Sequence, residues 1–96
     1  MFATSNRKGI EMKRLVEEVD DDGFTPFMGQ RITLLCMNYF YTGKLVAVNS
    51  TFVELADAAI IYETGEWGSK TWKDAQSLPG NVRVMVAAIE SFGVWK

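Results

Sequence analysis

The 96-residue chain contains no histidine and only one cysteine, Cys36. Histidine and cysteine supply most zinc sites and most bases and nucleophiles of catalytic triads, so these kinds of site lack their usual residues. The phosphate-binding patterns GxxxxGK[ST] and GxGxxG are also missing. The sequence therefore predicts a non-catalytic protein that needs no metal and no cofactor.

A single cysteine cannot form an intramolecular disulfide. Cys36 lies in an apolar run, which predicts a small buried core residue. The N-terminal stretch MFATSNRKGIEMK lacks the apolar segment of a signal peptide, and nothing in the chain approaches the roughly 20 apolar residues of a membrane span. Together with the free thiol, these features predict a cytoplasmic protein with no membrane partner.

The charge balance is slightly acidic, with 12 acidic and 10 basic residues and a net charge of -2. A nucleic-acid-binding domain is usually clearly basic, so the overall charge does not favour one. The charges are segregated, however. A basic cluster near the N-terminus consists of Arg7, Lys8, Lys13 and Arg14, and an acidic run follows it: Glu17, Glu18, Asp20, Asp21 and Asp22. We interpret the two as a solvated helix with an acidic exit, because the acids lack the spacing of a calcium loop.

One domain over residues 1–96 suits this length and a composition that is 48% hydrophobic. Apolar residues at helical spacing predict an α-helix at about 7–19. Alternating apolar and polar residues predict five strands, at about 31–37, 39–48, 52–62, 82–87 and 89–95. An insertion at 63–80 separates the third strand from the fourth, and one helical turn is predicted within it at 71–77. The fold class is mainly β.

Three positions suggest how the strands are bent and joined. Gly43, in the middle of the second strand, permits a bend or the close approach of another backbone. The sequence Asn49-Ser50-Thr51 predicts a turn between the second and third strands. Only Ala87-Ala88 separates the last two strands, so we expect a sharp bend there. Such bends are typical of a small barrel.

The insertion combines aromatic and basic residues: Trp67, Lys70, Trp72 and Lys73. One interpretation is that the rings stack on bases while the lysines contact phosphates. The other is that the tryptophans pack the insertion onto the barrel or onto a neighbouring subunit. We favour packing.

The pattern Tyr41-x-Gly43-x-Leu45 followed by Asn49 resembles the first motif of the Sm-like family, which includes the LSm proteins and Hfq. Asn49 stands where that family usually has aspartate. The segment VMVAAIESF, residues 84–92, is similar to the second motif as Hfq carries it. The resemblance covers about residues 10–62 and 82–95, and the whole chain looks most like small Sm-like proteins encoded by cyanophages.

This resemblance implies an N-terminal α-helix followed by a strongly bent five-stranded barrel of the SH3 type. It also implies a homo-oligomeric ring in which the predicted fourth strand pairs with the fifth strand of the next subunit. Family members bind uridine-rich RNA at the turns after the second strand and before the fifth. Here Thr51 and Val53 replace the stacking and base-reading residues, and the small apolar residues 86–88 replace a charged pair, so the usual uridine pocket is not expected.

The remaining candidates for binding nucleic acid fall into two groups. The first lies at the turn that would face the pore, and the second would be repeated around one face of a ring. The candidates are Asn49, Ser50 and Thr51 at the turn, and Arg7, Lys8, Lys13 and Arg14 in the predicted helix.

Three hypotheses follow from the sequence. The first is a ring that binds RNA or another single-stranded nucleic acid. The second is a structural or protein-binding ring that has lost RNA recognition, which the acidic balance and the missing pocket residues favour. The third is a monomeric SH3-like barrel that binds a peptide in an aromatic groove.

Overall fold

The computed structural model describes residues 23–96. The predicted helix at 7–19 lies outside the described residues, and so does the basic cluster formed by Arg7, Lys8, Lys13 and Arg14. Within residues 23–96, helical structure is limited to two short 3-10 turns, η1 (Thr25–Phe27) and η2 (Val86–Ala88). The regular secondary structure of the described residues is therefore mainly β.

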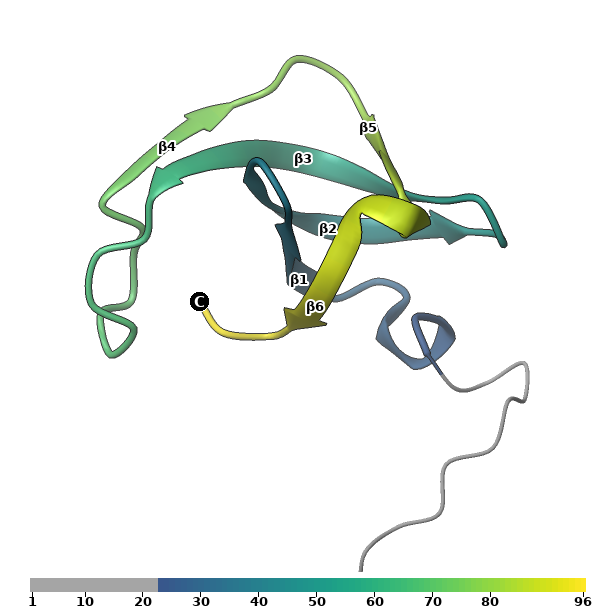
Figure 1. Ribbon diagram of the computed structural model, residues 1–96, viewed down its shortest axis with the longest axis horizontal. Helices are drawn as coiled ribbons and strands as arrows, with labels where there is room; N and C mark the ends of the chain where they lie inside the picture. The colour runs from purple at the N-terminus through teal and green to yellow at the C-terminus, as the bar shows by residue number, and fades with distance from the viewer. Residues whose placement is uncertain (1–22) are drawn as a thin grey trace, which may run out of the picture.

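A single antiparallel sheet of six strands forms the fold (Figure 1). The strands are β1 (Arg31–Cys36), β2 (Phe40–Val48), β3 (Phe52–Glu63), β4 (Asp74–Ser77), β5 (Val82–Met85) and β6 (Ile89–Gly93). Their order is β4-β3-β2-β1-β6, and β5 also pairs with β3. The first three predicted strands are confirmed to within one residue at each end. The fourth predicted strand ends early because η2 occupies residues 86–88, and the fifth begins at Ile89 as predicted but ends at Gly93.

The 12-residue strand β3 organises one side of the sheet. One of its edges pairs with β2, and the other is shared by β4 and β5. Ala59 to Glu63 pair with β4, whereas Phe52 to Leu55 pair with β5. Figure 1 shows β4 and β5 one after the other along this edge.

The strand β4 corrects the prediction for the insertion. Residues 71–77 were predicted to contain one helical turn within a loop, but Asp74–Ser77 form a strand and bring the total to six. An isolated helical turn fixes several backbone dihedrals for very few hydrogen bonds. The free edge of β3 offers these backbone groups partners directly, so pairing with the sheet prevails.

The predicted barrel is not closed within one chain. Among the described residues, β5 pairs only with β3 and β6 pairs only with β1, so each strand leaves one edge unpaired. In a flat sheet β5 and β6 would lie about 19 Å apart, four strand spacings. The chain from Met85 to Ile89 spans at most about 14 Å. The sheet must therefore curl, and the sharp bend predicted at Ala87-Ala88 is confirmed as η2.

Gly43 allows β2 and β3 to come close together. A Cβ atom at Gly43 would lie 2.9 Å from the Cβ of Leu55 and 3.1 Å from the carbonyl oxygen of Ala56. The β2–β3 register shifts at this point, and Asp57 opposite adopts a φ of 50°. The predicted close approach of another backbone at Gly43 is therefore confirmed, at a β-bulge.

The hydrophobic core lies on the concave side of the curled sheet. Its buried residues are Ile32, Leu34, Cys36, Leu45, Val53, Leu55, Ala58 and Val84. Cys36 is 6% exposed, so the prediction that it is buried is confirmed. Its burial is the main cause that raises the pKa of the thiol, and the charge of Glu90 is the second. Phe92 on β6 packs on Phe24 with ring centroids 4.3 Å apart and meets the edge of Phe27 at 5.5 Å, so the segment before β1 covers the end of the core.

Candidate functional site

Asn49 organises the turn between β2 and β3. Its side-chain oxygen Oδ1 accepts hydrogen bonds from the backbone N–H groups of Thr51 at 2.7 Å and Phe52 at 2.8 Å. Its own N–H donates to the carbonyl of Phe52 at 3.0 Å. The amide oxygen is thus used inside the turn, and Asn49 serves as a turn-forming residue rather than as a ligand contact through that atom.

Two turns that are distant in sequence lie side by side. The N–H of Val86 donates to the carbonyl of Thr51 at 2.8 Å, and Phe52 pairs with Met85 across β3 and β5. The structure therefore brings the candidates Asn49, Ser50 and Thr51 next to η2. The exposed side chains at this junction are those of Asn49, Ser50, Thr51, Met85 and Ala87. They are uncharged and not aromatic, so they provide neither a stacking ring nor a cation for a base or phosphate.

A polar cluster lies beside this junction on the outer face of β3 and β5. Glu54 accepts hydrogen bonds from Asn81 Nδ2 at 2.9 Å and Arg83 Nε at 3.0 Å. Both bonds lower the pKa of the Glu54 carboxyl, and the bond from Asn81 has the larger effect. The guanidinium of Arg83 also lies 4.6 Å from the centroid of the Phe52 ring. Arg83 is consequently held by a carboxylate and an aromatic face of its own chain.

Most basic side chains in the described part of the chain have protein partners. Residues 23–96 contain six basic and six acidic residues. Ion pairs join Arg31 to Asp57 at 3.4 Å, Lys73 to Glu63 at 3.6 Å, and Arg83 to Glu54 at 3.0 Å; Lys96 is bound by backbone carbonyls. This balanced surface lacks the excess positive charge typical of a nucleic-acid interface.

The basic and aromatic insertion is organised by internal contacts. Trp67 meets both Trp72 and Trp95 edge to face, with ring centroids 5.6 Å apart in each case. Lys73 pairs with Glu63 at the end of β3. The structure thus agrees with the packing interpretation, and the partner of the insertion is the C-terminal segment after β6.

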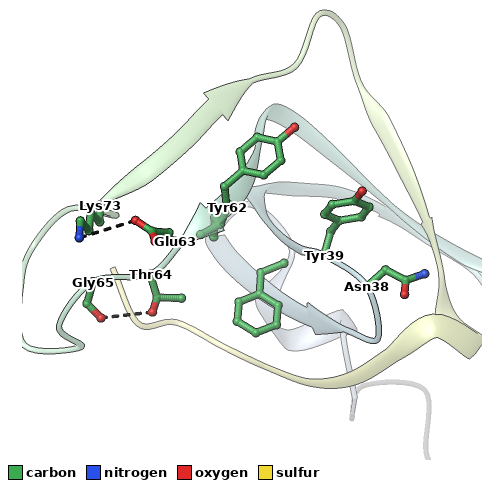
Figure 2. A pocket seen from close by; sticks show the side chains of 9 residues that line it. Asn38, Tyr39, Tyr62, Glu63, Thr64, Gly65 and Lys73 are labelled. Carbon is green, nitrogen blue, oxygen red and sulfur yellow. Dashed lines mark hydrogen bonds and ion pairs between the residues drawn. The ribbon is translucent and has the colours of Figure 1, made fainter.

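A pocket of about 540 Å³ opens between the β1–β2 turn and the end of β3 (Figure 2). It is lined by Asn38, Tyr39, Phe40, Ile61, Tyr62, Glu63, Thr64, Gly65 and Lys73. Tyr39 and Tyr62 are 48% and 50% exposed and meet edge to face at 6.3 Å. Figure 2 shows them side by side, with the Glu63–Lys73 ion pair beyond Tyr62. The lining therefore combines two exposed aromatic rings with an ion pair in an open hollow.

This pocket was not predicted from the sequence. Tyr39 and Tyr62 are far apart along the chain, and each stands at a strand end, where alternation says little about burial. The register of β2 and β3, in which Phe40 pairs with Ile61, places the two tyrosines opposite each other. Tyr39 and Tyr62 can be recognised as neighbours only when the register of β2 and β3 is known.

A second, more apolar groove of about 340 Å³ follows the unpaired edge of β5. The β1–β2 turn forms its opposite wall. It is lined by Cys36, Met37, Asn38, Tyr39, Tyr41, Val82, Arg83, Val84, Met85 and Ala88. Burial raises the pKa of the Tyr41 hydroxyl, and the neighbouring Cys36 raises it further. The lining of the groove is thus mostly apolar and lies beside an unpaired strand edge.

The direction of the backbone groups on β5 and β6 follows from the pairing. Antiparallel strands alternate between hydrogen-bonded and non-hydrogen-bonded pairs. The bond between Val86 and Thr51 sets this alternation on β5, so Arg83 and Met85 direct their N–H and C=O groups away from β3. On β6, the bond from Cys36 to Tyr39 sets the alternation through β1, and Phe92 is directed outward.

A scan against models of protein families finds no match to this chain, and a search of curated proteins finds none. Among residues 23–96, no helix is long and apolar enough to cross a membrane. In the same part of the chain, no three or more His, Cys, Asp or Glu side chains are grouped so that they could hold a metal ion. Function has to be inferred from the edges, grooves and charges described above.

Proposed function

We propose that this protein is a non-catalytic β module that assembles into a homo-oligomeric ring, of the Sm-like kind that its sequence resembles, and serves as a structural or protein-binding scaffold. One observation carries the proposal. The curled sheet leaves three short strands with an unpaired edge within residues 23–96, β4, β5 and β6, and two of them, β5 and β6, are consecutive in the chain. Both strands are joined to η2, which brings the two edges close together.

Unpaired sheet edges bind other strands unless they are protected. The edge of β5 comprises four residues and that of β6 five, so the two are matched in length. Pairing β5 of one subunit with β6 of the next would satisfy the outward backbone groups of Arg83, Met85 and Phe92. Such a head-to-tail contact generates a ring when its rotation closes. The groove beside β5 would receive apolar side chains of the incoming strand.

The substitution Met85→Pro tests this assembly. Met85 has a φ of -68°, which proline adopts, and the preceding residue Val84 is in a strand, as a residue before proline prefers. The N–H of Met85 faces away from β3, so its loss removes no hydrogen bond among residues 23–96. We expect light scattering to show an oligomer for the wild-type protein and a folded monomer for Met85→Pro.

Met85→Ala is the matched control, because it removes the same exposed side chain and keeps the N–H group. It should assemble more like the wild type than Met85→Pro does, and circular dichroism should show the same sheet content in all three proteins. Assembly of Met85→Pro at wild-type affinity would show that the β5 edge is not the contact. A monomeric wild-type protein would contradict the ring and favour the SH3-like peptide-binding alternative.

Binding of single-stranded nucleic acid is the second candidate function. The motif order and the basic cluster Arg7, Lys8, Lys13 and Arg14 favour it, whereas the paired cations of the described residues favour the scaffold. Fluorescence anisotropy with uridine-rich, adenine-rich and random RNA at about 50 and 200 mM salt separates the two. Affinity that falls steeply with salt and is lost when the four basic residues are replaced would establish nucleic-acid binding. The scaffold predicts no such binding.

A further inference from the structure

The last residue, Lys96, reaches back to the loop between β3 and β4. Its Nζ atom donates hydrogen bonds to the carbonyl oxygens of Thr64 and Glu66, both at 2.8 Å, and of Thr71 at 3.2 Å. An ammonium group has three N–H donors and no acceptor. The three carbonyls therefore satisfy every donor of this group, which is the arrangement expected of a specific ammonium site.

Aromatic rings add to the same site. Nζ lies 4.4 Å from the ring centroid of Trp72 and 5.6 Å from that of Trp67. A cation over the face of an indole is attracted by the ring quadrupole. Trp95 packs against Trp67 with ring centroids 5.6 Å apart and so supports its ring. The site thus combines three carbonyl dipoles with two indole rings and uses no carboxylate, although Glu66 contributes its backbone.

Several contacts that shape this loop do not involve Lys96. The N–H of Ser69 donates to the carbonyl of Glu66 at 3.0 Å, and the N–H of Thr71 donates to Ser69 Oγ at 3.3 Å. Gly65 has a φ of 72°, which favours glycine, and a Cβ atom there would lie 3.1 Å from the Cβ of Lys73. These contacts give the loop its shape, so the carbonyls stay directed at one point when the lysine side chain is removed.

We propose that the loop from Thr64 to Lys73 is a receptor for a primary alkylammonium group, occupied by Lys96 of the same chain. A lysyl side chain, or an alkylamine of similar length, is the class of ligand that would take the place of Lys96. The tripod of carbonyls discriminates between cations. A quaternary ammonium has no N–H to donate, and a guanidinium is a planar fork that does not match three converging acceptors. The site lies within one chain, so it does not require assembly into an oligomeric ring.

The three tryptophans of the chain are Trp67, Trp72 and Trp95, so tryptophan fluorescence, excited at wavelengths that tyrosine does not absorb, reports on this site and its immediate support. Lys96→Met removes the ammonium and keeps most of the side-chain length. We expect its emission to differ from the wild type and to return toward it on titration with n-butylammonium chloride, with half-saturation in the millimolar range or weaker. The affinity is expected to be this weak because a free amine lacks the covalent linkage that holds Lys96 next to the site.

The controls separate the ammonium site from general effects. n-Butanol has no charge, and tetramethylammonium has no N–H, so neither should produce the saturable change. Lys70→Met is the same substitution at an exposed lysine of the same loop. It should leave Lys96 in the ammonium site, so the fluorescence should not respond to n-butylammonium. Equal responses to n-butylammonium and tetramethylammonium, or no response of a folded Lys96→Met protein, would overturn the proposal.

A measurement on the wild-type protein covers the case in which Lys96→Met does not fold. Acetylation by a limiting amount of an activated ester, read residue by residue by mass spectrometry, should be several-fold slower at Lys96 than at Lys70. The reason is that the Lys96 ammonium is held by three carbonyls, whereas Lys70 is exposed. Equal acetylation rates at the two lysines would contradict the site.

Discussion

The backbone N–H of Val86 donates a 2.8 Å hydrogen bond to the carbonyl of Thr51. This bond fastens η2 to the β2–β3 turn. The side chain of Asn49 in turn holds the N–H groups of Thr51 and Phe52. The two turns therefore form one rigid unit, and the bond sets which backbone groups of β5 face the unpaired edge.

The first prediction concerns Asn49. Asn49→Ala leaves two backbone N–H groups without their acceptor and should lower the free energy of unfolding by about 1–2 kcal/mol. Asn49→Asp retains a side-chain oxygen and should stay close to the wild type. Thr51→Ala is the matched control, because this exposed residue holds η2 through its backbone carbonyl; its fold and its assembly should be unchanged. Urea denaturation measures all three, and equal midpoints for Asn49→Ala and Thr51→Ala would contradict the role of Asn49.

Gly43 should tolerate no side chain. The nearest atoms belong to the backbone or the Cβ positions of β3, which cannot rotate away, so Gly43→Val should cost about 1–3 kcal/mol or more and loosen the β2–β3 bend. Gly68→Ala is the control, since nothing lies within 4 Å of a Cβ atom there. That change should stay within about 0.5 kcal/mol. A Gly43→Val protein with an unchanged thermal midpoint would show that β2 and β3 can move apart at this point without loss of stability.

The hydrogen-bonded carboxyl of Glu54 should make the stability of the protein depend on pH in acid. Because its pKa is lower in the folded than in the unfolded protein, its contribution to stability is fully present above the ordinary value of about 4.5. That contribution is lost as the pH falls through the lower folded value. We expect the difference in urea midpoint between the wild type and Glu54→Gln to be constant from pH 7 down to about 4.5 and to narrow below it. Arg83→Met should weaken this dependence, and a difference that widens in acid would have the wrong sign.

Cys36 should react slowly in the folded protein. Burial limits the access of a reagent to the sulfur. Burial and, second, Glu90 also raise the pKa of the thiol, which lowers the fraction present as reactive thiolate. Alkylation by iodoacetamide at pH 8, followed by mass spectrometry, should be at least about tenfold slower than in denaturant, a difference of about 1.4 kcal/mol in activation free energy. Glu90→Gln, which removes the smaller cause, should accelerate the native reaction modestly. Equal rates in the native and unfolded states would mean that β6 opens readily from β1.

The strands that the sequence predicted well are those whose pattern is local. Ile32, Leu34 and Cys36 alternate with other residues and are buried on one face of β1, so their burial follows from the period of a strand. The bends at Gly43 and at η2 were also predicted from local residues. β4 was missed because Asp74–Ser77 are exposed and mostly polar, and such a segment becomes a strand only because β3 offers it an edge.

The chain alone determined that this is a mainly β protein with tight bends and a buried thiol, and that it contains no histidine. Tertiary structure decided which strand lies on which edge, and so left β5 and β6 unpaired in one chain. It also decided the meeting of Tyr39 with Tyr62 and of Lys96 with the loop at Thr64. Periodicity reports the local backbone conformation, whereas register and edge pairing depend on contacts between residues distant in sequence, which local alternation does not encode.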